Sequence, residues 1–353
     1  MAQRDRVLPP LLRRRGTDLL RRDERAHRRA RARLRPHRGL PRVRTAPRRG
    51  LLHRRVRPRG DRSAGGASAP PHRRGRRGAG TSDDDEPFFL WAAFTAPHDP
   101  RTPPEEFARL YDRTDPAAVP LPENYRADPV DTAPLGERDE TLAALPREDE
   151  EVRGHLADYY GMISHLDHGI GRILETLETL GLAEDTLVVY TADHGLALGQ
   201  HGLMGKQNLY EHSLRVPLLL AGPGLEAGRS LDPLSLHADL LPTLLGLAGA
   251  PVPSGVQGRD LGPLLRGADD ATPPRQMVHA AYVDRARMAS DGEHKLIRHL
   301  APVRRDELYA LRTDPGERHD VAADPALAPI RERLAASLAA WQRDSGDPWA
   351  GAV

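Results

Sequence analysis

The pattern of hydrophobic positions divides the chain near residue 82. Before it, apolar residues follow neither the 3.6-residue period of a helix nor the two-residue period of a strand, apart from a short helical hint around Leu11–Leu20. From Pro87 the pattern changes, and the continuous apolar run Pro87–Pro97 (PFFLWAAFTAP) predicts a buried strand. We therefore expect any globular domain to begin near Pro87.

The longest periodic segment predicts a helix over residues 148–181. Its apolar residues recur at steps of three and four, and Gly181 is a candidate C-terminal cap. The β-branched, apolar segment Thr186–Thr191 then predicts a strand buried on both faces, and it ends in the polar turn Ala192-Asp193-His194-Gly195. A helix, a buried strand and a polar turn in this order are typical of an α/β fold, in which ligands bind beyond the carboxyl ends of the strands.

The segments on either side of this unit are shorter. Residues 99–150 are rich in proline and acidic residues and predict a long excursion over the surface with one short helix near Pro104–Tyr111; a loop of that length is usually functional. In chain order, the later segments predict a strand over Arg215–Gly224, a helix over His237–Gly249 with Pro242 near its first turn, a small antiparallel sheet within residues 277–313, and an amphipathic terminal helix over Ile330–Asp344.

Charge separates the same two parts of the chain. Residues 1–82 hold 27 arginines, no lysine and 5 acidic residues, a net charge of +22, whereas the remainder carries −20 and all 15 aromatic residues. So much charge with so little hydrophobicity predicts disorder. Three interpretations stay open: a basic tail for nucleic acid, a targeting peptide, and a G/C-rich gene read out of frame. We favour the last, because the whole chain uses 50 arginines and 2 lysines.

Composition also excludes several classes of protein. No apolar run approaches the roughly 18–20 residues of a membrane span, so we expect no membrane partner. The absence of cysteine excludes disulfides, thiolate metal sites and a cysteine nucleophile. No signal peptide is visible, so the compartment stays open, with the cytoplasm as the default expectation.

Two segments carry the strongest chemical signals. Asp193 and His194 offer a hard oxygen and a nitrogen ligand, which together suit a divalent metal; the alternative is a turn in which Asp193 caps the next helix. Lys206 lies thirteen residues further on, in the glycine-rich loop LGQHGLMGK. Because the chain otherwise uses arginine, a lysine here indicates a compact ammonium for a phosphate-like or sulfate-like oxyanion, unless it is an ordinary surface lysine.

Histidines supply the other candidates. His98 follows the first predicted strand between two prolines, where it could transfer a proton to a leaving group or bind an anion; the alternative is a solvated loop histidine. His201 lies in the same glycine-rich loop as Lys206 and could line the site. We interpret His165 and His168 as packing or surface residues.

Taken together and in order, these motifs resemble the sulfatase family of the alkaline-phosphatase-like superfamily, over roughly residues 83–348. The matching segments are FLWAAFTAPHDP, YYGMISHLDHG…TLVVYTADHG, LGQHGLMGKQNLYEHSLRVPLLLAGPG, HADLLPTLLGLAGAPVP and HKLIRHL…ELYALRTDPGERHDVAADP. The histidine after Asp193 and the HG-x-x-x-K spacing look most like the iduronate-sulfatase and choline-sulfatase branch.

The resemblance implies an α/β fold, the alkaline-phosphatase-like sandwich, with a mostly parallel central sheet flanked by helices and a small C-terminal antiparallel sheet and helix. We expect three parts: residues 1–82, a partial core domain over 83–270, and a C-terminal α+β subdomain over 271–353.

The resemblance also implies roles for individual residues. Asp193 and His194 would bind a divalent metal, usually Ca²⁺, with Mg²⁺ or Mn²⁺ as alternatives. Lys206 would hold a sulfate oxygen, and His98 would contact the sulfate and its bridging oxygen and assist departure of the alcohol. These two residues would bind the substrate, a small-molecule or carbohydrate sulfate ester, and from its place in the same loop we expect His201 to bind it as well. We expect no nucleic-acid partner.

The sequence departs from the family pattern in its N-terminal part. The family nucleophile is a formylglycine made from a C/S-x-P-x-R motif, which this chain does not encode; in Ser68–Arg73 the arginine is one position late. The Asp-Asp pair expected after the first strand has no counterpart in residues 1–82. We therefore expect a metal-dependent sulfate ester hydrolase, truncated or frame-disrupted at its N-terminus and inactive as written, whose central sheet lacks its first strands and exposes apolar edges.

Two alternatives remain. One is a phosphoester or phosphonate hydrolase on the same fold, and the other is a non-catalytic binder of nucleic acid or another polyanion through the arginine-rich segment. The sequence specifies neither the alcohol part of the substrate nor the oligomeric state.

Overall fold

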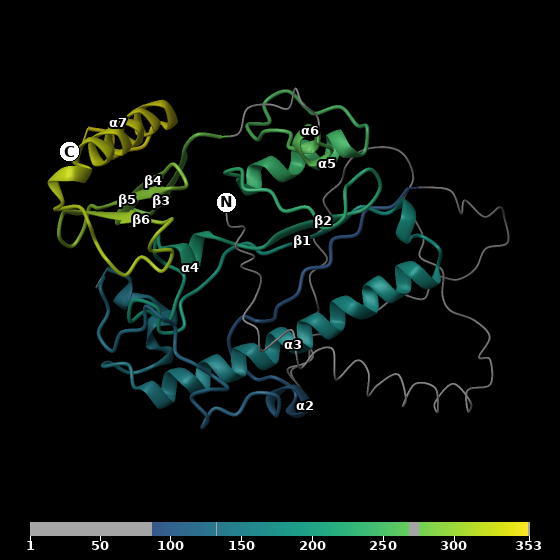
Figure 1. Cartoon of the computed structure of the whole chain (residues 1–353), viewed down its shortest axis with the longest axis horizontal. Coiled ribbons are helices and arrows are strands. Elements are labelled where there is room, and N and C mark those ends of the chain that lie inside the picture. The colour runs from purple at the N-terminus through teal and green to yellow at the C-terminus, as the bar shows by residue number, and fades with distance from the viewer. Residues whose placement is uncertain (1–86, 132, 268–274, 352–353) are drawn as a thin grey trace. The chain divides into compact units, whose positions relative to one another are not determined.

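The structure, a computed structural model, describes residues 87–131, 133–267 and 275–351 (Figure 1). The chain separates into two units; the described residues 87–93 belong to the first, and those from Phe94 onward belong to the second. The predictions made for residues 1–82 and the domain boundary predicted at 270/271 lie outside the described residues. The second unit is a mixed α/β structure, and the elements below belong to it.

Helix α3 (Asp149–Thr179) confirms the helix predicted over residues 148–181 and is the long helix of Figure 1. Its first turn carries three acidic residues, which favour the positive end of the helix dipole. Gly181, just past its end, adopts the left-handed conformation with φ of 70°, as expected of the residue that follows a helix C-cap. The short helix α2 (Glu105–Ala108) packs on α3 and confirms the helix predicted near Pro104–Tyr111.

Strands β1 (Val188–Thr191) and β2 (Leu218–Ala221) confirm two predicted strands, each shorter than its predicted range. They pair antiparallel, with Val188 opposite Ala221, in a two-stranded sheet. The parallel strands expected of a central sheet are not among the described elements. The prediction that β1 is buried on both faces is wrong, because its residues are half-buried and Tyr190 is exposed.

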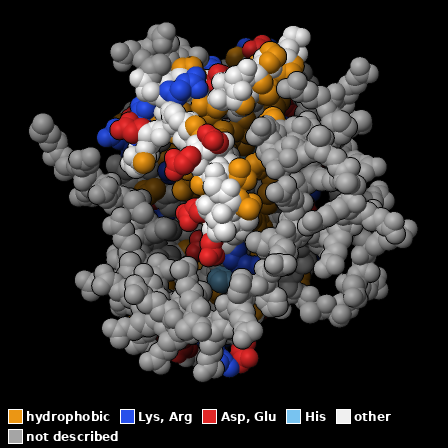
Figure 2. Space-filling model, turned by 90° about the vertical axis from the view of Figure 1, so that its right-hand side faces the viewer, with side chains coloured by type: hydrophobic (Ala, Val, Ile, Leu, Met, Phe, Trp, Pro, Cys, Tyr) orange, Lys and Arg blue, Asp and Glu red, His pale blue; other side chains and the backbone are white. Residues whose placement is uncertain are grey.

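The strand predicted over Pro87–Pro97 is also wrong. The described residues of this run have no regular secondary structure, and Phe89 and Trp91 are 80% and 76% exposed. A strand exists only through hydrogen bonds to a neighbour, and no described strand pairs with this segment. Leu219 of β2 is likewise exposed. On the face shown in Figure 2, apolar side chains reach the surface beside acidic ones.

The C-terminal part confirms the predicted antiparallel sheet and terminal helix. The sheet has the order β3-β4-β5-β6, and every neighbouring pair is antiparallel. Helix α7 packs on β4 and β5. The elements are β3 (Val278–Tyr282), β4 (Ala286–Ser290), β5 (His294–His299), β6 (Arg305–Ala310) and α7 (Ala328–Ser345).

This sheet has two covered faces, because successive residues of a strand point to opposite sides. On one side a buried cluster joins the sheet to α7, and on the other a second cluster joins it to the loop that carries Lys206. The first cluster contains Ala289, Leu296, Leu308, Leu334 and Leu338, and the second contains Met288, Ile297, Tyr309, Leu203, Leu209 and Tyr210. The sheet thus supports the loop that carries the candidate lysine.

The segment over residues 99–150, predicted to run over the surface, is partly buried. Val119 and Ala143 are buried in a third cluster with Val152 and Leu156 of α3, and Arg147 is buried. The expectation of a surface loop is wrong here because the segment packs against the first half of α3.

The remaining elements are short. The helix predicted over His237–Gly249 is confirmed as η4 followed by α5, with Pro242 in the first turn of α5. None of the helices that the structure describes combines the length and hydropathy of a membrane span. The short elements are η1 (Ala133–Gly136), η2 (Arg138–Leu142), η3 (Ala183–Asp185), α4 (Glu211–Leu214), η4 (His237–Asp239), α5 (Leu240–Leu247), α6 (Gly262–Leu265) and η5 (Pro325–Leu327).

Candidate active site

Backbone hydrogen bonds within the loop that carries Lys206 fix its conformation. The Ala197 N–H donates to the Gly205 carbonyl at 2.8 Å, and the Gly199 N–H donates to the Leu203 carbonyl at 2.8 Å. Leu203 lies in the core beneath the loop. Lys206 follows at the rim, where about a quarter of its side chain is exposed.

The side chains of His98 and Lys206 are in contact, although 108 residues separate them in the chain. The Lys206 Nζ donates to His98 Nε2 at 3.3 Å. His98 Nδ1 lies 2.8 Å from the carbonyl oxygen of Asp99, and because a carbonyl only accepts, we assign the ring hydrogen to Nδ1 and the lone pair to Nε2. The structure therefore brings together the two residues predicted to bind the anion.

Asp193 and His194 lie together in the turn after β1. The imidazole Nδ1 of His194 donates to the Gly195 carbonyl at 2.8 Å, which leaves Nε2 as the free ligand atom. That nitrogen lies 3.6 Å from Oδ2 of Asp193, whose side chain is 88% exposed. Asp193 caps no helix, since the next one, α4, begins at Glu211; the alternative interpretation as a helix cap is wrong.

Two neighbouring elements fix this turn. The Gly195 N–H donates to the Ser213 carbonyl at 3.0 Å, and a Cβ at Gly195 would lie 2.0 Å from the carbonyl oxygen of His212, so only glycine fits. On the other side, His237 Nε2 donates to the Ala192 carbonyl at 2.7 Å. His237 was not among the predicted site residues; its position as the first residue of the predicted helix was the available signal.

The donor set of this turn suits part of a divalent metal site. Asp193 supplies oxygen and His194 supplies a free nitrogen on the same side of the turn. A cation such as Ca²⁺ takes about 6–8 ligands, so these two residues form a fraction of a coordination shell. Within residues 87–131, 133–267 and 275–351, no group of three or more potential ligand side chains surrounds a common point. In the same ranges, no hydrogen bond or ion pair joins this turn to His98 or Lys206.

His201 is packed in the interior, against the prediction that it binds substrate. Its side chain stacks on Tyr210 with ring centroids 4.2 Å apart, and only 2% of the residue is exposed. With φ of 55°, the residue lies in the left-handed region. Burial lowers the pKa of its imidazole to about 4, so the ring is neutral at ordinary pH.

This burial predicts a pH dependence of stability. Because the folded state prefers the neutral ring, the stabilisation from His201 is complete above its ordinary pKa of 6.5 and is lost as the pH falls toward about 4. The His201→Asn variant, which tolerates the left-handed backbone, should show a shallower loss over that interval, by about one proton in slope. Urea unfolding at several pH values measures both slopes; parallel curves would contradict the shifted pKa.

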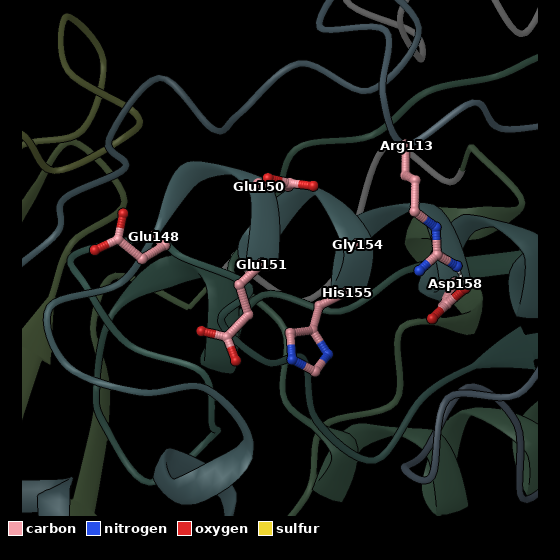
Figure 3. A pocket seen from close by; sticks show the side chains of 7 residues that line it. All are labelled: Arg113, Glu148, Glu150, Glu151, Gly154, His155 and Asp158. Atoms are coloured by element: carbon pink, nitrogen blue, oxygen red, sulfur yellow. Dashed lines mark hydrogen bonds and ion pairs between the residues drawn. The ribbon is translucent and has the colours of Figure 1, made fainter.

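A cavity of the described surface lies away from these residues. This cavity, of about 570 Å³ at the start of α3, contains none of the predicted site residues. Figure 3 shows Arg113 facing Asp158 at one end of it and His155 beside Glu151. Its lining, Arg113, Glu148, Glu150, Glu151, Gly154, His155 and Asp158, has four carboxylates and disfavours an anion such as sulfate.

Comparison with known proteins identifies the family. The sulfatase family model matches residues 79–250, and the model of the C-terminal region of N-sulphoglucosamine sulphohydrolase matches residues 199–344. This chain is a sulfatase family member. The family is generally metal-dependent, which agrees with the oxygen and nitrogen donors of Asp193 and His194.

Two curated relatives lie in the predicted branch. The choline-sulfatase of Rhizobium meliloti is 34% identical over 258 residues, which are 69% of this chain and 48% of the relative. The iduronate 2-sulfatase of Mus musculus is 32% identical over 202 residues, which are 47% of this chain and 37% of the relative. The chain thus spans less than half the length of these relatives.

Two solved structures of the superfamily share the fold. BT4656, solved with its substrate D-glucosamine-2-N,6-O-disulfate, is 29% identical with a TM-score of 0.52, over 60% of this chain and 45% of that chain. The phosphonate monoester hydrolase of Agrobacterium radiobacter is 26% identical with a TM-score of 0.62, over 74% of this chain and 58% of that chain. The α/β fold of this sulfatase family member is therefore alkaline-phosphatase-like, with the C-terminal antiparallel sheet and helix that were predicted.

Proposed function

We propose that this chain belongs to a hydrolase of sulfate esters and that Lys206 and His98 bind the sulfuryl group. The observation that carries the proposal is the contact of 3.3 Å between Lys206 Nζ and His98 Nε2, from two segments far apart in the chain. An ammonium and an imidazole at this separation can both reach oxygens of one tetrahedral anion, provided that His98 takes up a proton on Nε2 and becomes a donor there. The family membership and the choline-sulfatase match support sulfate as that anion.

The reaction requires that the bond between sulfur and the alcohol oxygen breaks while a water oxygen joins the sulfur. The leaving alkoxide takes a proton. We assign its delivery to His98, which can give a proton from Nε2 once the ring is doubly protonated, while Lys206 holds a sulfate oxygen and offsets its charge. Asp193 and His194 would hold a divalent metal, for which Ca²⁺ is our proposal; when bound, it would polarise a sulfate oxygen. The substrate would be a small-molecule or carbohydrate sulfate ester, as the relatives' names suggest.

Sulfate binding tests this proposal directly. The full chain should bind inorganic sulfate in isothermal titration calorimetry, and Lys206→Ala should weaken binding by about tenfold or more, because a charge-assisted hydrogen bond is lost. Arg113→Ala is the matched control: it also removes a cation paired with a carboxylate, but one at the cavity of Figure 3. Equal binding by Lys206→Ala and the parent chain would overturn the proposal.

Turnover is a separate question. Since the chain encodes no C/S-x-P-x-R motif, the prediction remains that it binds sulfate without hydrolysing an aryl sulfate. Hydrolysis above the level of the Lys206→Ala variant would contradict that prediction while supporting the assignment of the site.

Phosphonate monoester hydrolysis is the second candidate, because a hydrolase of that class shares the fold over 74% of this chain. Methylphosphonate and sulfate should be titrated in parallel. Tighter binding of methylphosphonate would favour the second candidate.

A further inference from the structure

The short helix η2 (Arg138–Leu142) contacts both halves of the proposed anion site. The guanidinium of Arg138 donates to both carboxylate oxygens of Asp99, at 2.6 and 3.1 Å. Asp99 is the residue whose carbonyl accepts from His98 Nδ1. One end of η2 is therefore tied to the segment that carries His98.

The next residue of η2, Asp139, is tied to the other half. Its Oδ2 accepts from Gln207 Nε2 at 3.1 Å and lies 3.4 Å from Lys206 Nζ. Only 7% of its side chain is exposed. Burial acts to raise the pKa of Asp139, but Gln207, Lys206 and Arg138 outweigh burial and hold this pKa below the ordinary value, so the carboxylate is charged.

Arg138 also donates to Oδ1 of Asp139 at 2.7 Å, which closes a ring of contacts. From His98 the ring passes through Asp99, Arg138 and Asp139 to Lys206, and it returns through the contact between Lys206 and His98. Two loops that the sequence separates by 108 residues are thus joined through a third segment.

We propose that Arg138 and Asp139 are positioning residues that hold His98 and Lys206 at the separation needed to bind one anion. The inference rests on the proposed function of that site. Neither residue needs to touch the anion: Arg138 acts through Asp99 on His98, and Asp139 acts directly on Lys206.

Charge makes the proposal testable. Apart from His98, the two cations Lys206 and Arg138 balance the two carboxylates Asp99 and Asp139. Replacing Asp139 by asparagine removes one negative charge and so raises the net charge of the site by one. By Coulomb attraction alone, this change would strengthen the binding of sulfate. If Asp139 positions Lys206, the same change weakens binding.

The first experiment is sulfate titration of the full-length Asp139→Asn variant by calorimetry. We expect binding about tenfold weaker than in the parent chain, the effect of one lost charge-assisted hydrogen bond. Asp158→Asn is the matched control, because it removes the same charge from an ion pair of 2.8 Å with Arg113, away from the ring. Unchanged or tighter binding by Asp139→Asn would overturn the proposal.

The second variant keeps the charge and changes only geometry. Arg138→Lys cannot make the two parallel bonds to Asp99, and 62% of the Arg138 side chain is exposed, so the fold tolerates the change. We expect weaker sulfate binding here too. Parent-like binding by Arg138→Lys would mean that Arg138 contributes charge and no positioning.

A third readout separates this inference from the proposed function. ¹⁵N spectra of the histidine rings, recorded without sulfate, report which nitrogen of His98 carries hydrogen. The parent chain and Asp158→Asn should show hydrogen on Nδ1, whereas Asp139→Asn should show a mixture, because Lys206 is released from Nε2. If the parent chain binds no sulfate, the proposed function fails, and this readout still decides: an unchanged tautomer in Asp139→Asn would overturn the positioning role.

Discussion

Replacing Arg147 by leucine is expected to lower the free energy of unfolding by about 3–5 kcal/mol, the cost of leaving a buried charge without its partner. The Arg147 side chain is entirely buried and donates to Glu140 Oε2 at 2.6 Å and to the Gly202 carbonyl at 3.0 Å. Glu140 also accepts from the Met204 N–H, so the pair fastens the loop that carries Lys206. Burial already raises the pKa of Glu140.

Urea unfolding followed by tryptophan fluorescence measures this loss. Arg113→Leu is the control, because it breaks an ion pair whose arginine is 55% exposed, and such surface pairs contribute about 0–1 kcal/mol. A similar decrease in unfolding free energy for the two variants would show that the buried Arg147–Glu140 pair contributes no more to stability than an exposed pair.

Replacing Lys295 by methionine is the second change with a large expected effect, again about 3–5 kcal/mol near neutral pH. The Lys295 ammonium is fully buried and lies 2.7 Å from one oxygen each of Glu211 and Glu317. It also donates to the Leu209 carbonyl at 3.1 Å. Methionine fills a similar volume but leaves the buried Glu317 without its cation.

The loss should depend on pH. Burial raises the pKa of Glu317 above its ordinary value of 4.5, and removal of Lys295 raises it further. A carboxyl group whose folded pKa is raised favours the folded state at low pH, and this contribution is lost as the pH rises from 4.5 through the folded pKa.

Unfolding of Lys295→Met and of the parent chain should therefore be compared at two pH values. The difference in unfolding free energy should be smaller near pH 4.5 than at about pH 8, since protonation removes the unpaired charge. A difference that grows toward low pH would contradict this account. Glu293→Gln, which breaks an exposed pair with Arg312, should cost little at either pH.

Local pattern was sufficient for much of the fold. The apolar steps of three and four predicted α3 to within two residues at each end. Shorter alternating segments predicted a small antiparallel sheet within residues 277–313, where strands β3–β6 lie. The run Pro87–Pro97 has the composition of a strand, but the prediction of a strand there was wrong. Composition does not show whether a neighbouring strand is present to form the hydrogen bonds that a strand requires.

The candidate site was only partly predictable. The rarity of lysine identified Lys206, and the same signal applies to Lys295, the other lysine of the chain, which the sequence analysis did not consider. Arg138 and Asp139 could not be found this way, because they lie in a segment without periodicity and their partners are distant in sequence. His201 shares the loop of Lys206, and only the three-dimensional packing on Tyr210 separates their roles.

The two covered faces of the C-terminal sheet limit how relatives of this protein can be recombined. A chimera that takes residues 271–353 from another sulfatase would replace Met288 and Ile297, which share a buried cluster with Leu203 and Leu209 of the Lys206 loop. The apolar side chains of the donor segment would therefore determine whether Lys206 keeps its position. A chimera between family members should therefore take the Lys206 loop and the C-terminal sheet from the same parent protein.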